Sequence, residues 1–132
     1  MRISITPCSA KKDASLRNSG VRVTPDKLYT ATTTRRFIEK CKATGVNWAI
    51  FSDQYGVWFP HVVHEWYEKD PDTVTDAEFR VLLRSFDDSL SNYDEILFYH
   101  NPGRFHPLHR RLVKETKLGG KLSLFSHLSE IR

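Results

Sequence analysis

Strand-like and helix-like segments alternate along this chain of 132 residues, and no other feature restricts its fold as strongly. The expected strands are short and apolar at their centres, whereas the expected helices repeat their apolar residues every three to four positions. Four strands are expected near 2–6, 47–52, 96–99 and 121–125, with helices over 32–43, 75–90 and 107–118 between them. We therefore predict an α/β fold in three layers: one domain, residues 1–132, with a four-stranded, mostly parallel sheet and helices on both faces.

The composition indicates a folded protein with its own core. Hydrophobic residues make up 39% of the chain and charged residues 27%, as in globular domains rather than disordered segments. No apolar run approaches the roughly 20 residues of a membrane helix, and the first residues are too few and too polar for a signal peptide. Cys8 and Cys41 are too few for a disulfide framework. We expect a cytoplasmic protein with free thiols and no membrane partner; its oligomeric state stays open.

The net charge of +4 conceals an uneven distribution along the chain. Residues 1–40 carry nine Lys/Arg and three Asp/Glu, and residues 60–95 carry three and ten. Residues 100–117 are basic again, with five Lys/Arg and one Asp/Glu. A basic face attracts polyanions such as nucleic acid or nucleotide phosphates, although the same pattern is also compatible with a solvated surface that has no partner.

Three polar loops are expected to meet at one edge of the sheet. Residues 7–12, 52–56 and 100–106 each follow a predicted strand. The carboxyl ends of parallel strands share an edge, and α/β proteins bind their ligands there. The remaining long connections, 8–27 and 53–74, show no helical or strand period and are expected to be loops, of the length that is often functional.

The loop after the first strand offers a thiol, a hydroxyl and two ammonium groups, on Cys8, Ser9, Lys11 and Lys12. Together with backbone amides they form a plausible anion-binding loop. The spacing of a P-loop is absent. Cys8 is either a nucleophile, if the lysines lower its pKa, or a small residue in a tight turn.

Other candidates follow from residue type and place. Tyr29 precedes the first helix and is suited to stacking on a base, and Arg36 in its first turns is suited to pairing with phosphate. Asp53 is either a general base or the cap of a turn. We predict Asp53 and Lys11 as catalytic residues. The predicted substrate-binding residues are Cys8, Ser9, Lys12, Tyr29, Arg36, Ser52, Tyr55, Gly56, His100, Asn101 and Arg104.

Six histidines raise the question of a metal. His61 and His64 are spaced so that they could supply two ligands, but neither a His-Glu-x-x-His pattern nor a Cys-x-x-Cys pattern accompanies them. We therefore expect no metal and no cofactor.

Three motifs in the first half of the chain carry a family resemblance. They are Cys8-Ser9-Ala10-Lys11-Lys12, Leu28-Tyr29-Thr30 and Ser52-x-x-Tyr55-Gly56-Val57, followed by Tyr67. The chain resembles a small prokaryotic family of uncharacterised domains with Cys-Ser-x-x-Lys, Leu-Tyr-x-Gly and Ser-Ala-x-Tyr-Gly motifs. It is more distantly similar to YaaA-type peroxide-stress proteins and to a domain of archaeosine synthase. The resemblance implies a Rossmann-like domain that occurs with nucleic-acid modification or damage response. This chain has Asp53 where the family usually has Ala.

Three functions remain open from the sequence. The first is an enzyme directed at a nucleotide or nucleic acid, for base or nucleoside modification. The second is a module that binds nucleic acid or nucleotide without turnover. The third is a protein-interaction domain that uses the aromatic segment 55–67, in which case Trp58 and Trp66 should be exposed.

Overall fold

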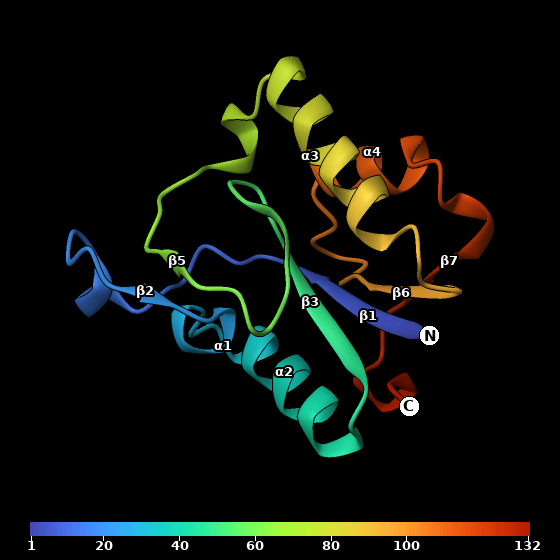
Figure 1. The fold of residues 1–132 in the computed structure, drawn as a ribbon, viewed down its shortest axis with the longest axis horizontal. Helices are drawn as coiled ribbons and strands as arrows, with labels where there is room; N and C mark the ends of the chain where they lie inside the picture. Colours follow the sequence, from blue (N-terminus) through green and yellow to red (C-terminus); the bar gives the residue numbers. More distant parts are fainter.

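A five-stranded sheet forms the centre of the computed structural model, which describes all 132 residues (Figure 1). The strand order is β4-β3-β1-β6-β7. β1, β3, β6 and β7 are parallel to one another, and β4 is antiparallel at the edge. The strands are β1 (Arg2–Pro7), β3 (Asn47–Ser52), β4 (Gly56–Trp58), β6 (Glu95–Tyr99) and β7 (Leu122–Phe125). The predicted α/β class and mostly parallel sheet are confirmed, but the predicted number of four strands is wrong.

The three predicted helices are present as α2 (Thr32–Thr44), α3 (Asp76–Leu90) and α4 (Pro107–Glu115), and a single turn, α1 (Pro25–Leu28), precedes them. α3 begins with the capping box, in which the Glu78 amide donates to Thr75 Oγ1 at 3.1 Å and the Thr75 amide donates to Glu78 Oε1 at 2.9 Å. α2 ends at Gly45, whose φ of 70° is the usual left-handed stop. None of the helices combines the length and the apolar character needed to cross a membrane.

Buried apolar side chains form two clusters, one on each side of the sheet. β3 contributes to both, because successive side chains of a strand point to opposite faces. Ala49 and Phe51 pack with residues of α3 and α4, whereas Trp48 and Ile50 pack with residues of α2. Figure 1 shows α2 on one side of the sheet and α3 with α4 on the other. The uninterrupted apolar centre of β3 thus reflects burial on both faces.

The two segments expected to be loops contain short regular elements. Residues 8–27 include the 3₁₀ turn η1 (Ala14–Leu16) and strand β2 (Arg22–Val23). Residues 53–74 include β4, strand β5 (His64–Glu65) and the 3₁₀ turn η2 (Pro71–Thr73). β2 and β5 pair as a separate antiparallel ribbon. The prediction of structureless loops is therefore wrong, because two- and three-residue strands are too short to produce a period in the sequence.

The strand order places a change of direction between β1 and β6. From β1 the chain passes through α2 to β3 on one side, and it later returns to β6 on the other side. Ligands of open α/β sheets bind outside the carboxyl ends of the strands at such a point. The loops after β1, β3 and β6 emerge at this edge, and the Cys8 amide donates to the Phe51 carbonyl at 2.9 Å.

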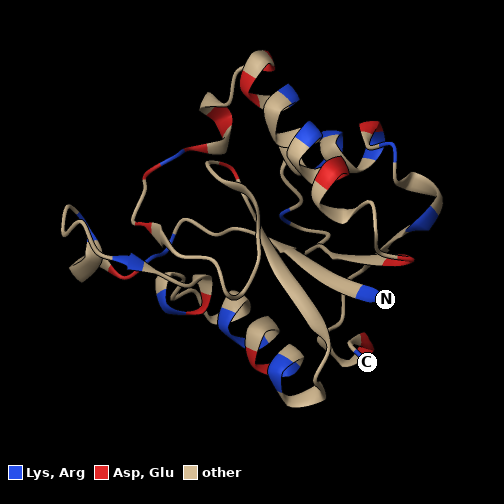
Figure 2. Ribbon diagram, in the orientation of Figure 1, with Lys and Arg blue, Asp and Glu red and all other residues tan.

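Charged side chains lie on the outer elements rather than in the sheet. Figure 2 shows Lys, Arg, Asp and Glu along α2, α3 and α4, while β3 and most of β1 carry none. The acidic residues between β5 and α3 gather around η2 and the start of α3.

Substitution of Gly56 is expected to cost more stability than substitution of Gly45. Both have positive φ, +75° and +70°, so alanine costs each about 1–2 kcal/mol. At Gly56 an added Cβ would also lie 2.6 Å from Ser85 Oγ, whereas at Gly45 nothing lies within 4 Å. We expect Gly56→Ala to lose at least about 1 kcal/mol more than Gly45→Ala in urea unfolding. Ser85→Ala in the Gly56→Ala background should recover part of the difference, and equal losses would contradict the packing of α3 on β4.

Candidate functional site

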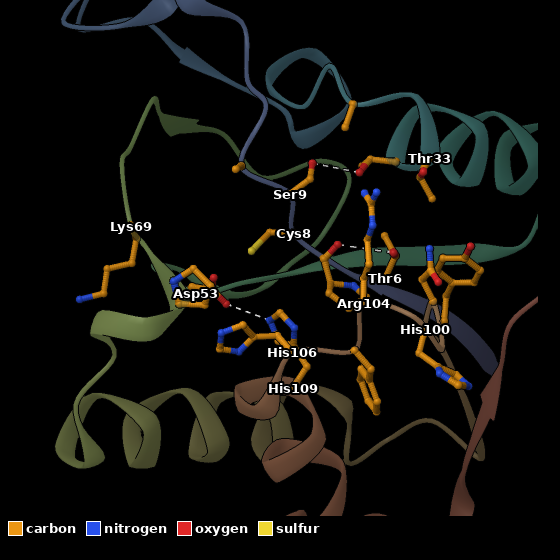
Figure 3. Close-up of a pocket in the computed structure, with 18 of the residues that line it drawn as sticks. Thr6, Cys8, Ser9, Thr33, Asp53, Lys69, His100, Arg104, His106 and His109 are labelled. Carbon is orange, nitrogen blue, oxygen red and sulfur yellow. Dashed lines mark hydrogen bonds and ion pairs between the residues drawn. The ribbon is translucent and has the colours of Figure 1, made fainter.

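A cavity of about 320 Å³ opens at the carboxyl ends of β1, β3 and β6 (Figure 3). The loops after all three strands line it, as the strand order requires. Further lining comes from the first turn of α2, from the segment 67–71 and from the start of α4. Its volume lies in the range of small-molecule sites, roughly 300–1,000 Å³.

One end of the cavity holds Cys8, Asp53 and His109, hereafter the Cys–Asp–His cluster. Asp53 Oδ1 and His109 Nε2 are 3.0 Å apart, with only 3% and 7% of the two side chains exposed. One potential ligand atom from each residue of the cluster lies within 4.8 Å of the other two. Three groups of different chemistry, a thiol, a carboxylate and an imidazole, therefore meet at one buried point beside the cavity.

The thiol of Cys8 is not activated by its surroundings. Burial raises the pKa of Cys8 to about 12, and the charge of Asp53 acts in the same direction. The lowering of the Cys8 pKa by the lysines, on which the nucleophile alternative depends, is absent. At neutral pH the group is a thiol, which argues against Cys8 as a free nucleophile.

Asp53 and His109, which pair with each other, are both held in position by their local structure. Asp53 follows β3 directly, in a tight turn where Ser52 Oγ accepts hydrogen bonds from the Gln54 and Tyr55 amides at 3.1 and 3.0 Å. His109 lies on the buried face of α4, and its ring packs perpendicular to Phe51 with centroids 5.9 Å apart. The carboxylate is therefore held by a hydrogen-bonded turn and the imidazole by a helix.

The opposite end of the cavity is formed by the start of α2. Its N-cap residue, Ala31, has no side chain that can accept a hydrogen bond from the first amides. Ser9 Oγ and Thr34 Oγ1 are 3.1 Å apart beside this helix start, and Thr33 also lines the cavity. Uncapped amides, the positive end of the helix dipole and hydroxyl groups together favour an anion.

Two cations border the cavity without an acidic partner. Arg104 makes no ion pair and no side-chain hydrogen bond, and Figure 3 shows it extending toward Ser9 and Thr33. Lys12 Nζ lies 4.4 Å from the centre of the Tyr67 ring, with no carboxylate within ion-pair distance, and burial lowers its pKa. Lys69, by contrast, pairs with Glu78 at 2.9 Å. Lys12 Nζ donates to the Ala10 carbonyl at 3.3 Å, but neither Lys12 nor Arg104 is neutralised by a carboxylate, so both can bind a ligand anion.

Two more histidines border the site. His106 Nδ1 accepts from the Leu108 amide at 2.9 Å, so the protonated Nε2 donates to Asp72 at 2.7 Å. This bond joins η2 to the start of α4 and fixes one wall of the cavity. His100 also lines the cavity, and its buried Nδ1 has no hydrogen-bond partner in the chain.

The structure brings only part of the predicted site together. Seven predicted residues line the cavity: Cys8, Ser9, Lys12, Asp53, His100, Asn101 and Arg104. Six do not, namely Lys11, Tyr29, Arg36, Ser52, Tyr55 and Gly56. Lys11 and Arg36 are exposed outside it.

Tyr29, predicted to stack on a base, and Tyr55, predicted to bind substrate, are both engaged in packing. Tyr29 is fully buried, and its hydroxyl lies 2.5 Å from that of Tyr67. Tyr55 stacks on His64, with centroids 3.9 Å apart, and donates to the Glu65 carbonyl at 3.0 Å. Trp58 is fully buried as well, and Trp66 is half-buried, so the exposure of Trp58 that the protein-interaction hypothesis requires is absent.

His109 is the residue that sequence reasoning missed. His109 lies in a basic region of the sequence, yet in α4 it is buried together with Leu112, three positions further along the helix. A histidine at a core position of a helix needs a polar partner, because burying an unpaired imidazole is costly. That pattern is the signal in the sequence that could have identified it.

Comparison with models of protein families, with curated proteins and with solved structures finds no match to this chain. The family resemblance of the three motifs therefore stays a prediction from residues.

Proposed function

We propose that the cavity binds a phosphate-bearing nucleotide, free or as part of a nucleic acid, and that the Cys–Asp–His cluster faces the part of the ligand that is modified. The proposal rests on the groups that surround the cavity. They are the uncapped start of α2 and two cations without acidic partners, Arg104 and Lys12. A single anion would satisfy all three, and phosphate forms the strong charge-assisted contacts that arginine favours.

The two ends of the cavity support an enzyme rather than a binding module. A phosphate held near Ser9 and Arg104 would place the rest of the ligand toward Asp53 and His109. Buried titratable groups beside a cavity cost stability and are characteristic of reactive sites. A module that only binds phosphate has no need of them. The Rossmann-like three-layer fold, the cytoplasmic location and the relation to nucleic-acid modification belong to the same proposal.

Arg104→Gln tests the phosphate end. We expect the four nucleoside 5′-monophosphates to bind more tightly than the matching nucleosides in isothermal titration calorimetry. Arg104→Gln should weaken nucleotide binding by about 10- to 100-fold, the loss expected for a hydrogen bond to a charged group. Arg36→Gln is the matched control, because Arg36 is exposed on α2 outside the cavity.

Three outcomes would contradict the proposal. They are no binding of any nucleotide, equal affinity for nucleosides and nucleotides, and equal losses in the two arginine variants. The third would indicate attraction to general positive charge rather than to the cavity. The same assay with 5′-phosphorylated DNA and RNA oligonucleotides distinguishes the nucleic-acid form of the ligand, and conversion of the bound nucleotide, followed by mass spectrometry, separates enzyme from binding module.

A further inference from the structure

We propose that the Cys–Asp–His cluster is a binding site for a divalent transition metal, with zinc as the best match. Cys8, Asp53 and His109 would supply one ligand atom each, and a group from the cavity would complete four-fold coordination. The proposal goes beyond the proposed function and does not depend on nucleotide binding. It also replaces the expectation of no metal that follows from the sequence.

The geometry of the cluster is close to that of a tetrahedral site. The usual Zn–N and Zn–O bond lengths, near 2.0–2.1 Å, place two ligand atoms about 3.3 Å apart. Asp53 Oδ1 and His109 Nε2 are 3.0 Å apart, so they already lie near the required separation. All three potential ligand atoms lie within 4.8 Å of one another, and an adjustment of about 1 Å by Cys8 would bring its sulfur to the tetrahedral position.

The donor set selects the class of metal. Thiolate and imidazole favour zinc and its neighbours, whereas magnesium and calcium prefer oxygen ligands alone. Charge is balanced as well, because one thiolate and one carboxylate offset the two charges of the ion.

The position of the cluster fits a metal with an open coordination site. Cys8, Asp53 and His109 all line the cavity, and they come from the loop after β1, the turn after β3 and the buried face of α4. Three protein ligands plus one exchangeable position are characteristic of catalytic zinc, whereas structural zinc has four protein ligands. Figure 3 shows that Cys8 and Asp53 extend toward the same space.

The test is direct measurement of metal on the full chain without a histidine tag. We expect one Zn²⁺ per chain by plasma mass spectrometry after loading with zinc and dialysis. Cys8→Ser should weaken zinc binding by more than the roughly 10- to 100-fold that loss of an outer-shell partner costs, as read by competition with a chromophoric chelator. Cys41→Ser is the matched control, since Cys41 is buried in α2 and does not line the cavity.

Co²⁺ provides a second readout that identifies the ligand. The Co²⁺ complex of the unsubstituted chain should show a thiolate-to-metal absorption band, which Cys8→Ser abolishes and Cys41→Ser retains. His109→Gln should lower affinity for both metals, and circular dichroism checks that this variant folds. Cys8 is only half-buried in a loop, so Cys8→Ser decides the question even if His109→Gln does not fold.

Two results would overturn the proposal. One is no zinc above background in the loaded protein. The other is unchanged zinc content and an unchanged cobalt spectrum in Cys8→Ser, which would place the metal elsewhere, for example at His61 and His64. Both results are independent of nucleotide affinity, so failure of the metal site and failure of the proposed function are distinguishable.

Discussion

Phe51→Ala is expected to lower the free energy of unfolding by about 3–5 kcal/mol, the usual range for removal of a buried phenylalanine. Phe51 lies in the central part of the sheet on β3 and is 1% exposed. Its ring contacts Phe86 of α3 edge-on and His109 of α4, in both cases with centroids 5.9 Å apart. The substitution therefore leaves a cavity between β3 and the two helices on this face and also removes the packing surface of His109.

The measurement is urea unfolding followed by tryptophan fluorescence, with the dependence on urea compared between variants to confirm that only stability changes. Val81→Ala on α3 is the control, because 66% of Val81 is exposed and its truncation should change stability by no more than about 0.5 kcal/mol. A loss below about 1 kcal/mol for Phe51→Ala would contradict the packing of α3 and α4 on this face.

The elements that could be predicted are those with a long, regular pattern. α3 combines a capping box with an apolar stripe at Phe79, Leu82, Phe86 and Leu90, so both its start and its buried face follow from the sequence. The central strands are equally clear because burial on both faces makes them continuously apolar. β4 was missed since it has only three residues and depends on pairing with β3.

The position of the cavity could be predicted in outline, because it follows from the topology of the sheet. Once the strands are parallel, the loops that hold Cys8, Asp53 and Arg104 must share an edge. The side-chain contacts could not be derived in this way. Asp53 and His109 are separated by 56 positions, and their contact depends on how α4 packs against Phe51.

Residue type alone also did not show whether a side chain lines the cavity, packs in the core or lies on the surface. Tyr29 and Tyr55 are suited to stacking on a base, but their rings are equally suited to packing. Tyr29 packs against Trp58, and Tyr55 packs against His64 of β5. Arg36 lies near the start of α2, as predicted, yet the helical period turns it to solvent while Phe37 and Ile38 are buried. The direction in which a charged side chain points from the helix axis therefore decides whether it reaches the site.

His109→Leu should destabilise the protein strongly, by about 3–5 kcal/mol, because it leaves the Asp53 carboxylate buried without its partner. Asp53 and His109 are both almost fully buried, so water from the cavity replaces only part of the lost contact. Asp53→Asn added to His109→Leu should recover about 1–3 kcal/mol, because an unpaired neutral amide costs less than an unpaired carboxylate. Asp53→Asn alone breaks the same pair and should be destabilising, so a double variant more stable than His109→Leu is a reversal that simple additivity forbids.

The free energies of unfolding of these variants are measured in urea with a chelator present, so that bound metal does not contribute to them. Arg80→Leu is the comparison: it breaks the Arg80–Asp76 pair of similar length, 3.0 Å, but with both side chains largely exposed, so its effect should be much smaller. A double variant no more stable than His109→Leu would show that the buried pair contributes little to folding. The same measurements with zinc separate the role of the two residues in folding from their role as metal ligands. Bound metal should stabilise the unsubstituted chain and leave the stability of His109→Leu nearly unchanged. The reason is that only a folded state with all three ligands binds the ion tightly.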